Sequence, residues 1–350
     1  MYSSKEVNME LGTLNELINT RSVIKHIRKH NKNMKQGAGI GNDYSCTDDI
    51  VAAEAVGDTP YIAWVKAMNN MAVSGTEISG VRIILLLPEI TEESEIKQYM
   101  KEFNLLADDS GVQILGGHSQ VSRAYNYVNF VVTVYGRNIG NNEKDVRYEH
   151  NTKAIDKNCR ILMVGYAGLM GTDILARTKF DELRTRFSES YIKDAFVCRK
   201  SYCISDSVKK LLELNTEKIL YMHDVSHGGI YGALWQLGSK IKKGIKVNNA
   251  DIPIKQETIE ICEFFNLNPY MLEGTGAFLA VIKPDTHSIG EDREQVLINA
   301  FSEYGIEAAF IGNVTDSNDK AVILGNEDNP ELRYLSPVKG DEIYKVVTRF

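Results

Sequence analysis

The sequence lacks the features that would place it in a membrane or in a secretory pathway. Its apolar runs are short, such as residues 83–88, and none approaches the ~18–20 residues that a membrane-spanning helix needs. The first residues, MYSSKEVNMELGTL, contain neither the apolar core nor the cleavage-like site of a signal peptide. We therefore expect a cytoplasmic protein without a membrane segment.

Cysteine is scarce, and the common catalytic motifs are missing. The five cysteines are odd in number and none has CxxC spacing, which argues against a disulfide framework and a zinc knuckle. His223 and His227 lie four apart but have too few further ligands at zinc spacing. The chain has no Walker A loop, no Rossmann fingerprint and no GxSxG elbow. These absences exclude the best-known nucleotide-binding and serine-hydrolase signatures.

Basic residues are also fewer than acidic residues. The chain has 40 lysine and arginine residues against 47 aspartate and glutamate residues, a formal net charge of -7. A protein that binds nucleic acid through a broad positive field is therefore not expected. A nucleotide needs only local positive charge, backbone amides or a metal ion, so this balance does not exclude nucleotide binding.

The 350 residues predict two domains of about 150 residues each, with a boundary near residue 150. Residues 11–35 have the spacing of an amphipathic helix, whose basic second half either faces solvent or neutralises a polyphosphate or an acidic partner. Further along, strands and helices are mixed without a repeat, including a strand at 81–88, a helix at 91–107 and strands at 127–135, 159–164, 218–222 and 277–282. This pattern predicts an α/β or α+β fold.

Glycine-bearing turns are expected after three of the strands, at residues 115–119, 165–171 and 223–229. Glycine lets a backbone approach a ligand closely, and a helix after the third turn would aim free amides at an anion. Asp43, Asp48 and Asp224 could supply the carboxylates that magnesium prefers when it binds with ATP. The alternative is that these residues only form tight turns and helix caps.

Taken in order, these motifs resemble those of the aminoimidazole ribonucleotide synthetase superfamily. Residues 223–229, HDVSHGG, resemble its D-[VP]-[ST]-x-G-G segment, and residues 41–43, 46–48, 68–75 and 114–119 resemble its GDD, T-T-D, V-N-D and G-G-[DE]-T elements. The segments at 161–168, 252–254, 262–269, 273–276 and 311–315 resemble the hydrogenase-maturation carbamoyl dehydratase branch most closely. The resemblance spans roughly residues 37–316.

The resemblance implies a two-domain fold and a homodimer. Residues 1–150 would form an ATP-binding and dimerisation domain, whose four-stranded sheet pairs with that of its mate to form a barrel. Residues 151–350 would form a mixed sheet flanked by helices. The implied ATP and phosphate site comprises Asp43, Asp48, Asn69, Asn70, Gly116, Gly117, His118, Asp224, Gly228 and Gly229, with Mg²⁺ held by Asp43, Asp48 and Asp224.

Two departures from the family pattern bear on function. Asn70 and His118 stand where the family places carboxylates, so two ligand positions have lost their negative charge. The hydrogenase-maturation enzyme modifies its own C-terminal cysteine, whereas the last cysteine here is Cys262, so that self-modification is not expected.

Three functional hypotheses follow. The first is an ATP-dependent enzyme that activates an amide or carbonyl oxygen of a small-molecule or protein substrate by phosphorylation. The second is a nucleotide-binding or partner-binding accessory protein that has lost catalysis. The third is a purely structural dimeric protein, which would bind no nucleotide. The sequence identifies no catalytic residue.

Overall fold

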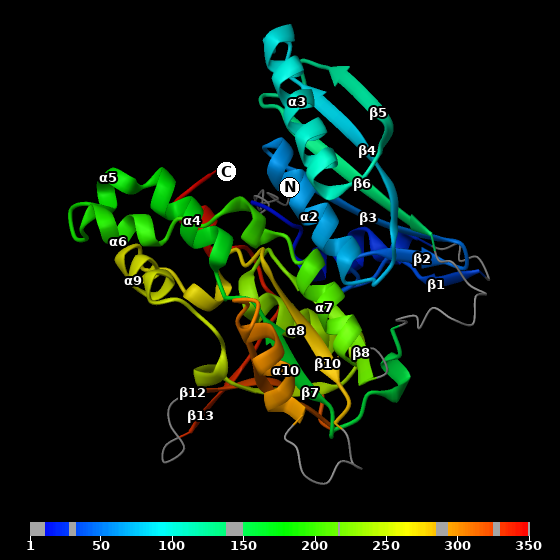
Figure 1. Cartoon of the computed structure of the whole chain (residues 1–350), viewed down its shortest axis with the longest axis vertical. Coiled ribbons are helices and arrows are strands. Elements are labelled where there is room, and N and C mark those ends of the chain that lie inside the picture. The colour runs from blue at the N-terminus through cyan, green and yellow to red at the C-terminus, as the bar shows by residue number, and fades with distance from the viewer. Residues whose placement is uncertain are drawn as a thin grey trace, which may run out of the picture.

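The computed structural model of the chain describes residues 11–27, 33–137, 150–215, 218–284, 293–324 and 330–348. Two sheets with their helices make up the molecule (Figure 1). The elements of the first half are α1 (Glu16–Ser22), η1 (Ile24–His26), β1 (Met34–Gln36), β2 (Ser45–Thr47), β3 (Ile50–Gly57), α2 (Pro60–Ala72), β4 (Ile78–Leu87), α3 (Glu93–Ser110), β5 (Ile114–Val121) and β6 (Asn129–Arg137).

The second half continues with η2 (Thr152–Ala154), β7 (Arg160–Val164), α4 (Leu169–Thr178), α5 (Phe180–Leu183), α6 (Glu189–Asp194), η3 (Arg199–Tyr202), α7 (Ser205–Asn215), β8 (Ile219–Val225), α8 (Gly229–Ile241), β9 (Gly244–Asn248) and η5 (Asn249–Asp251). It ends with α9 (Gln256–Phe264), η6 (Pro269–Met271), β10 (Ala277–Ile282), α10 (Arg293–Ser302), β11 (Ala308–Thr315), β12 (Lys320–Leu324), β13 (Glu331–Tyr334) and η7 (Glu342–Lys345).

The first sheet has the strand order β1-β2-β3-β6-β4-β5, in which only the β4–β5 pair is parallel. Alternate residues of β4 and β6 are buried against α2 and α3, because successive side chains of a strand point to opposite faces. Thr59 caps α2, and Gly111 ends α3 in the left-handed conformation that glycine adopts without strain. The opposite face of this sheet, on β3 and β6, forms one wall of the candidate site described below.

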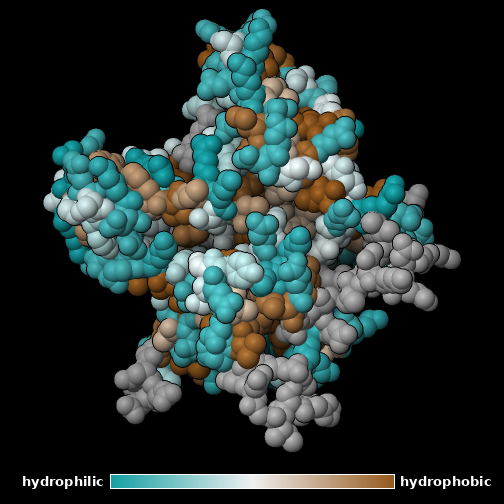
Figure 2. All heavy atoms as spheres, in the orientation of Figure 1, coloured by the Kyte–Doolittle hydropathy of each residue, from teal (hydrophilic) through white to brown (hydrophobic). Residues whose placement is uncertain are grey.

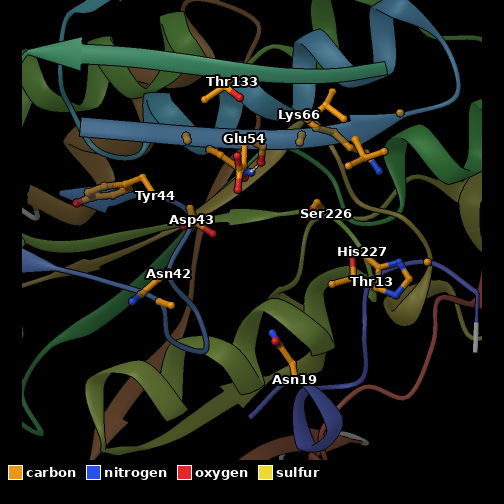
Figure 3. A pocket seen from close by; sticks show the side chains of 18 of the residues that line it. Thr13, Asn19, Asn42, Asp43, Tyr44, Glu54, Lys66, Thr133, Ser226 and His227 are labelled. Atoms are coloured by element: carbon orange, nitrogen blue, oxygen red, sulfur yellow. Dashed lines mark hydrogen bonds between the residues drawn. The ribbon is translucent and has the colours of Figure 1, made fainter. Parts of the chain in front are cut away.

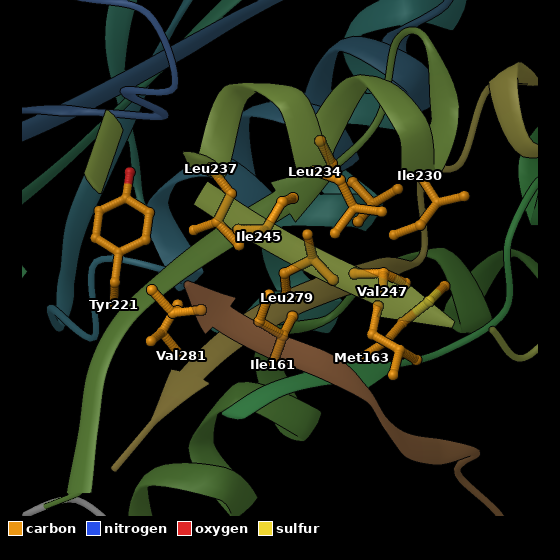
Figure 4. Close-up of a cluster of buried hydrophobic side chains, with 14 of the residues drawn as sticks. Ile161, Met163, Tyr221, Ile230, Leu234, Leu237, Ile245, Val247, Leu279 and Val281 are labelled. Carbon is orange, nitrogen blue, oxygen red and sulfur yellow. The ribbon is translucent and has the colours of Figure 1, made fainter. Parts of the chain in front are cut away.

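The second sheet has the order β13-β12-β9-β11-β7-β10-β8 and is covered on both faces. Helix α8 packs its apolar stripe onto one face, where Leu234 and Leu237 meet Leu279 and Val281 (Figure 4). Helices α7 and α10 cover the other face. Strands β8 and β10 are therefore buried throughout, and β7 is buried except at Arg160, as their near-continuous apolar sequences require. The expected mixed sheet flanked by helices is confirmed.

Several expectations from the sequence are wrong in detail. Over the described residues the first sheet has six strands instead of four, with β1 and β5 at its edges. The expected barrel needs the sheet of a second copy and stays a prediction. The helix expected at 11–35 ends at Ser22, just before the β-branched pair Val23 and Ile24, and residues 34–36 form a strand. Pairing with β4 keeps Gly116 and Gly117 within a strand, and pairing with β10 does the same for His223 and Asp224. The domain boundary near residue 150 stays a prediction.

Within the described ranges, every helix is too short or too polar to cross a lipid bilayer.

Candidate functional site

A cavity of about 1,090 Å³ lies between the open face of the first sheet and the start of helix α8 (Figure 3). One wall consists of residues 52–58 of β3 and the following turn, with Thr133 of β6. The other wall consists of residues 37–45, Ser226 and His227, and the N-terminal segment contributes residues 11–13. Its volume lies just above the range of about 300–1,000 Å³ that is typical of small-molecule and cofactor sites.

A buried ion pair between Asp43 and His223 holds the segment of residues 37–45 against strand β8. The Nδ1–H of His223 donates to Oδ2 of Asp43 at 2.8 Å, and Nε2 contacts Oε1 of Gln236 at 3.0 Å. Since both partner atoms are acceptors, the imidazole carries both protons and is cationic. Burial alone would lower the pKa of His223, but the charge and hydrogen bond of Asp43 outweigh it and raise the pKa.

The neighbouring carboxylate, that of Asp224, is buried without a hydrogen-bond partner that would offset the cost of its desolvation. Its side chain is 3% exposed, and among the described residues neither carboxylate oxygen has a hydrogen-bond partner. Its backbone N–H donates to Asp43 at 3.3 Å, which places the two residues side by side. Burial, followed by the charge of Asp43, raises the pKa of Asp224 to about 8. An orphaned buried carboxylate beside a second carboxylate fits a hard divalent cation such as Mg²⁺.

A second charged cluster, around Glu273, lies on the α2 side of the cavity. Nζ of Lys66 contacts Oε2 of Glu273 at 2.8 Å, and Oε1 accepts from the backbone N–H and the hydroxyl of Thr275 at 3.2 and 2.6 Å. Asp341 accepts the backbone N–H of Glu273 at 3.0 Å, and its Oδ2 lies 4.0 Å from Nδ1 of His227. Burial lowers the pKa of His227, so this imidazole is neutral near pH 7.

The N-terminus of α8 is already occupied by protein groups. Gly228 and Gly229 have φ angles of 81° and 62°, which only glycine adopts without strain. The N–H of Gly228 donates to Oδ2 of Asp341 at 2.6 Å, and the N–H of Gly229 donates to the carbonyl of Ser226 at 3.0 Å. A phosphate contact at these amides stays a prediction, because both amides have protein acceptors here.

The structure brings some of the other predicted residues to the cavity and not others. Asn70 lines it and donates to the carbonyl of Glu54 at 3.1 Å. Asn69 is fully buried and instead braces the start of α7, since its amide contacts Tyr202 and Ile204. Asp48 lies in the β2–β3 turn, and Gly116, Gly117 and His118 lie on the exposed edge strand β5; none of these four lines the cavity. Their roles stay predictions.

The N-terminal segment closes against the far end of the cavity. Gly12 has a φ of 92°, and a Cβ at this residue would come within 2.4 Å of the His227 ring and 2.7 Å of the Tyr344 ring. Glu16 in α1 is 8% exposed, and burial raises its pKa to about 7 despite a hydrogen bond with Gln236. Glycine at residue 12 is therefore required for the segment to reach this position.

Sequence reasoning missed Lys66, Glu273 and Asp341. The sequence did contain one signal for Lys66, which is the only charged residue in α2, PYIAWVKAMNNMA. A single lysine in a helix whose other residues are mostly buried indicates a buried partner. Nothing local could identify that partner, because Glu273 is 207 residues away along the chain.

Comparison with known proteins gives a consistent set of similarities. Residues 157–325 match the family described as AIR synthase related protein, C-terminal domain. A putative hydrogenase expression/formation protein of Methanocaldococcus jannaschii is 26% identical over 270 residues, which cover 77% of this chain and 73% of the relative. A carbamoyl dehydratase HypE of Rhizobium leguminosarum bv. viciae is 23% identical over 251 residues, which cover 71% of this chain and 65% of the relative.

The fold is also that of solved structures. The hydrogenase maturation protein HypE, in a crystal structure in complex with ATP, superimposes with a TM-score of 0.63. The alignment covers 94% of this chain and 96% of that chain, at 16% sequence identity. At this identity the likeness shows the shared fold alone.

Proposed function

We propose that the chain, whose residues 157–325 match the C-terminal domain of AIR synthase related proteins, binds ATP with magnesium in the cavity described above. It would use the ATP to phosphorylate an amide or carbonyl oxygen of a substrate. The ATP-bound HypE structure of the same fold and the carbamoyl dehydratase among the relatives support this proposal. The volume of about 1,090 Å³ leaves room for a nucleotide and a small acceptor together.

One observation carries the nucleotide assignment: the orphaned carboxylate of Asp224 beside Asp43. Leaving a buried carboxylate unpaired is costly, and a cation bound there would remove that cost. In the proposal Asp43 and Asp224 hold Mg²⁺, which would neutralise phosphate charge and orient the triphosphate. The cationic His223 keeps Asp43 in place through the 2.8 Å ion pair.

The experiment that tests this proposal is thermal unfolding with and without millimolar Mg-ATP. At about 100 times its dissociation constant, a ligand of the folded state adds ~2.7 kcal/mol to the free energy of unfolding. We expect the melting temperature to rise with Mg-ATP and to rise much less for Asp43→Asn. Adenosine with magnesium, which lacks phosphates, is the ligand control. An unchanged melting temperature with Mg-ATP would overturn the proposal.

A second candidate, a nucleotide-binding accessory protein without catalysis, is favoured by Asn70. This neutral amide lines the cavity and hydrogen-bonds to the backbone of Glu54, where the family resemblance implies a metal-binding carboxylate. The two candidates differ in turnover: the purified enzyme would release ADP in the presence of its acceptor, whereas the accessory protein would bind Mg-ATP and leave it intact.

The proposal includes a homodimer built through the first sheet. Strand β5 has no partner on its outer edge among the described residues, and its Leu115 and Val121 are 52% and 58% exposed. Figure 2 shows apolar patches on the upper lobe, where α3, β4 and β5 lie. A second copy would cover this edge and could bring Gly116, Gly117 and His118 toward a nucleotide. We expect sedimentation equilibrium to give twice the chain mass; a monomer at micromolar concentration would contradict this arrangement.

A further inference from the structure

Lys66 is the one lysine or arginine among the described residues that line the cavity. The same lining contains three acidic residues, Asp43, Glu54 and Asp58, and Asp224 is buried directly behind Asp43. A triphosphate placed among these carboxylates would meet repulsion on most sides. The ammonium group of Lys66 is therefore the main positive charge that the chain itself offers to a phosphate.

The lysine is held in a fixed position by a buried acceptor. Its side chain is 17% exposed, and that of Glu273 is 1% exposed. Glu273 is in turn fixed by the two hydrogen bonds from Thr275 and by the contact of its N–H with Asp341. An ammonium has three N–H donors, so it can serve a fixed carboxylate and a phosphate oxygen at the same time.

Two buried carboxylates and an imidazole gather beside Lys66. His227, Glu273 and Asp341 offer ligand atoms that lie within 4.8 Å of one another, a spacing that could hold a metal ion. The ammonium of Lys66 contacts this cluster directly through Glu273. The lysine ammonium thus supplies positive charge to a cluster whose spacing could otherwise hold a metal ion.

Residue 70, one helical turn after Lys66, lacks the negative charge that the family resemblance implies. Lys66 and Asn70 lie four positions apart, so they are neighbours on one face of α2, and both line the cavity. The family resemblance implies a carboxylate at residue 70, where it would help to hold a metal ion. Here that carboxylate is a neutral amide, and one turn earlier the helix carries a positive charge.

We infer that Lys66 binds a phosphate of the nucleotide at the α2 side of the cavity, in place of one divalent cation. This inference rests on the proposed function and specifies its charge balance: the Asp43–Asp224 pair holds magnesium, and Lys66 supplies the second positive charge. It follows that ATP keeps substantial affinity for this protein when free magnesium is removed, and that this magnesium-independent affinity depends on Lys66.

The test is isothermal titration calorimetry of ATP, ADP and adenosine, each in EDTA and in excess magnesium. For Lys66→Met we expect ATP affinity in EDTA to fall about 10- to 100-fold, the range for a charge-assisted hydrogen bond worth about 1.5–3 kcal/mol. Adenosine affinity should stay unchanged, because adenosine has no phosphate. Lys210→Met is the matched control, since it removes the same charge from α7, where Lys210 contacts Tyr304 outside the cavity.

A second variant keeps the test valid if Lys66→Met folds poorly. The double variant Lys66→Met/Glu273→Gln removes both charges of the buried pair, so that Glu273 is not left as a buried carboxylate without its lysine. It should lose ATP affinity in EDTA to the same extent and keep adenosine affinity. In Lys66→Ala, added ethylammonium should restore part of the ATP affinity, which a purely structural role of the lysine would not produce.

The outcomes separate this inference from the proposed function. If the wild type binds no ATP in either buffer, the proposed function fails and the inference fails with it. If the wild type binds Mg-ATP but the double variant binds ATP equally well in EDTA, only the role of Lys66 is overturned. If the wild type binds ATP only when magnesium is present, Lys66 does not replace a cation, and the inference is likewise overturned.

Discussion

Replacement of Asp224 by asparagine should stabilise the nucleotide-free protein and remove its response to Mg-ATP. The buried carboxylate has no hydrogen-bond partner among the described residues, and burial raises its pKa from an ordinary value of 3.8 to about 8. A raised carboxyl pKa means that the folded state binds the proton more tightly than the unfolded state. The folded protein therefore loses stability as the pH rises from about 4 to about 8, and asparagine removes this loss.

Near pH 8 we expect Asp224→Asn to raise the free energy of unfolding by about 1–3 kcal/mol. The gain is limited because an unpaired buried amide still carries part of the desolvation cost. Urea unfolding at pH 5 and pH 8 measures it, and the difference between variant and wild type should grow with pH. Asp181→Asn is the matched control, because that carboxylate is 95% exposed and its loss should change stability by less than about 0.5 kcal/mol. With Mg-ATP the wild type should become the more stable of the two, because the ligand adds ~2.7 kcal/mol to its free energy of unfolding and little to that of the variant. A variant that is less stable without nucleotide, or that still binds Mg-ATP, would refute the assignment of Asp224.

Asp341→Ala should have the opposite effect and destabilise the protein without any ligand. This carboxylate is fully buried and accepts three backbone N–H groups, from Gly228 at 2.6 Å, Glu273 at 3.0 Å and Ile343 at 2.9 Å. Alanine would leave these buried donors without an acceptor, at about 1–3 kcal/mol each. Burial and the charge of Glu273 raise the pKa of Asp341, so the charged carboxylate is itself destabilised in the folded protein, and its removal offsets part of this cost. We therefore expect the free energy of unfolding to fall by about 2–4 kcal/mol in total.

Urea unfolding should show this loss of stability for Asp341→Ala as a lower midpoint with an unchanged slope. Asp341→Asn should be intermediate, because its amide keeps one acceptor oxygen and loses the other. Asp316→Ala, at a carboxylate that is 60% exposed, is the control for loss of charge. If Asp341→Ala were as stable as this control, Asp341 would not organise the start of α8 and the loop before β10.

Much of the fold could be predicted from local sequence, because many elements carry their own signals. Helix α3 has an apolar stripe and begins at a capping box of Glu92 and Glu95, and Gly111 ends it. Strands β6, β7 and β10 have the alternation or the continuous apolar run that their burial demands. Where prediction failed, tertiary pairing overrode a local signal. Glycine and polar residues suggested turns at Gly116 and at His223, yet neighbouring strands extend both segments as strands.

The candidate site was less predictable, because its residues come from distant parts of the chain. Asp43 and Asp224 were expected from motif resemblance, and the structure places them side by side. The pair of Lys66 with Glu273 has no local signature on the Glu273 side, and the three amides that hold Asp341 belong to three different segments. Sequence patterns report local periodicity and turn chemistry, whereas these contacts depend on how segments far apart in the chain pack together.

The long separation of the site's partners has a consequence for the order of folding. The contacts of Asp43 with His223, of Lys66 with Glu273 and of Asp341 with Gly228 span 180, 207 and 113 residues. Contacts of such separation form late, because the chain between them must first lose its freedom. During synthesis, the first sheet can assemble from residues 34–137 long before residue 341 is translated. A nascent chain that has folded its first half would therefore still lack the proposed nucleotide site, which would be complete only when synthesis is nearly finished.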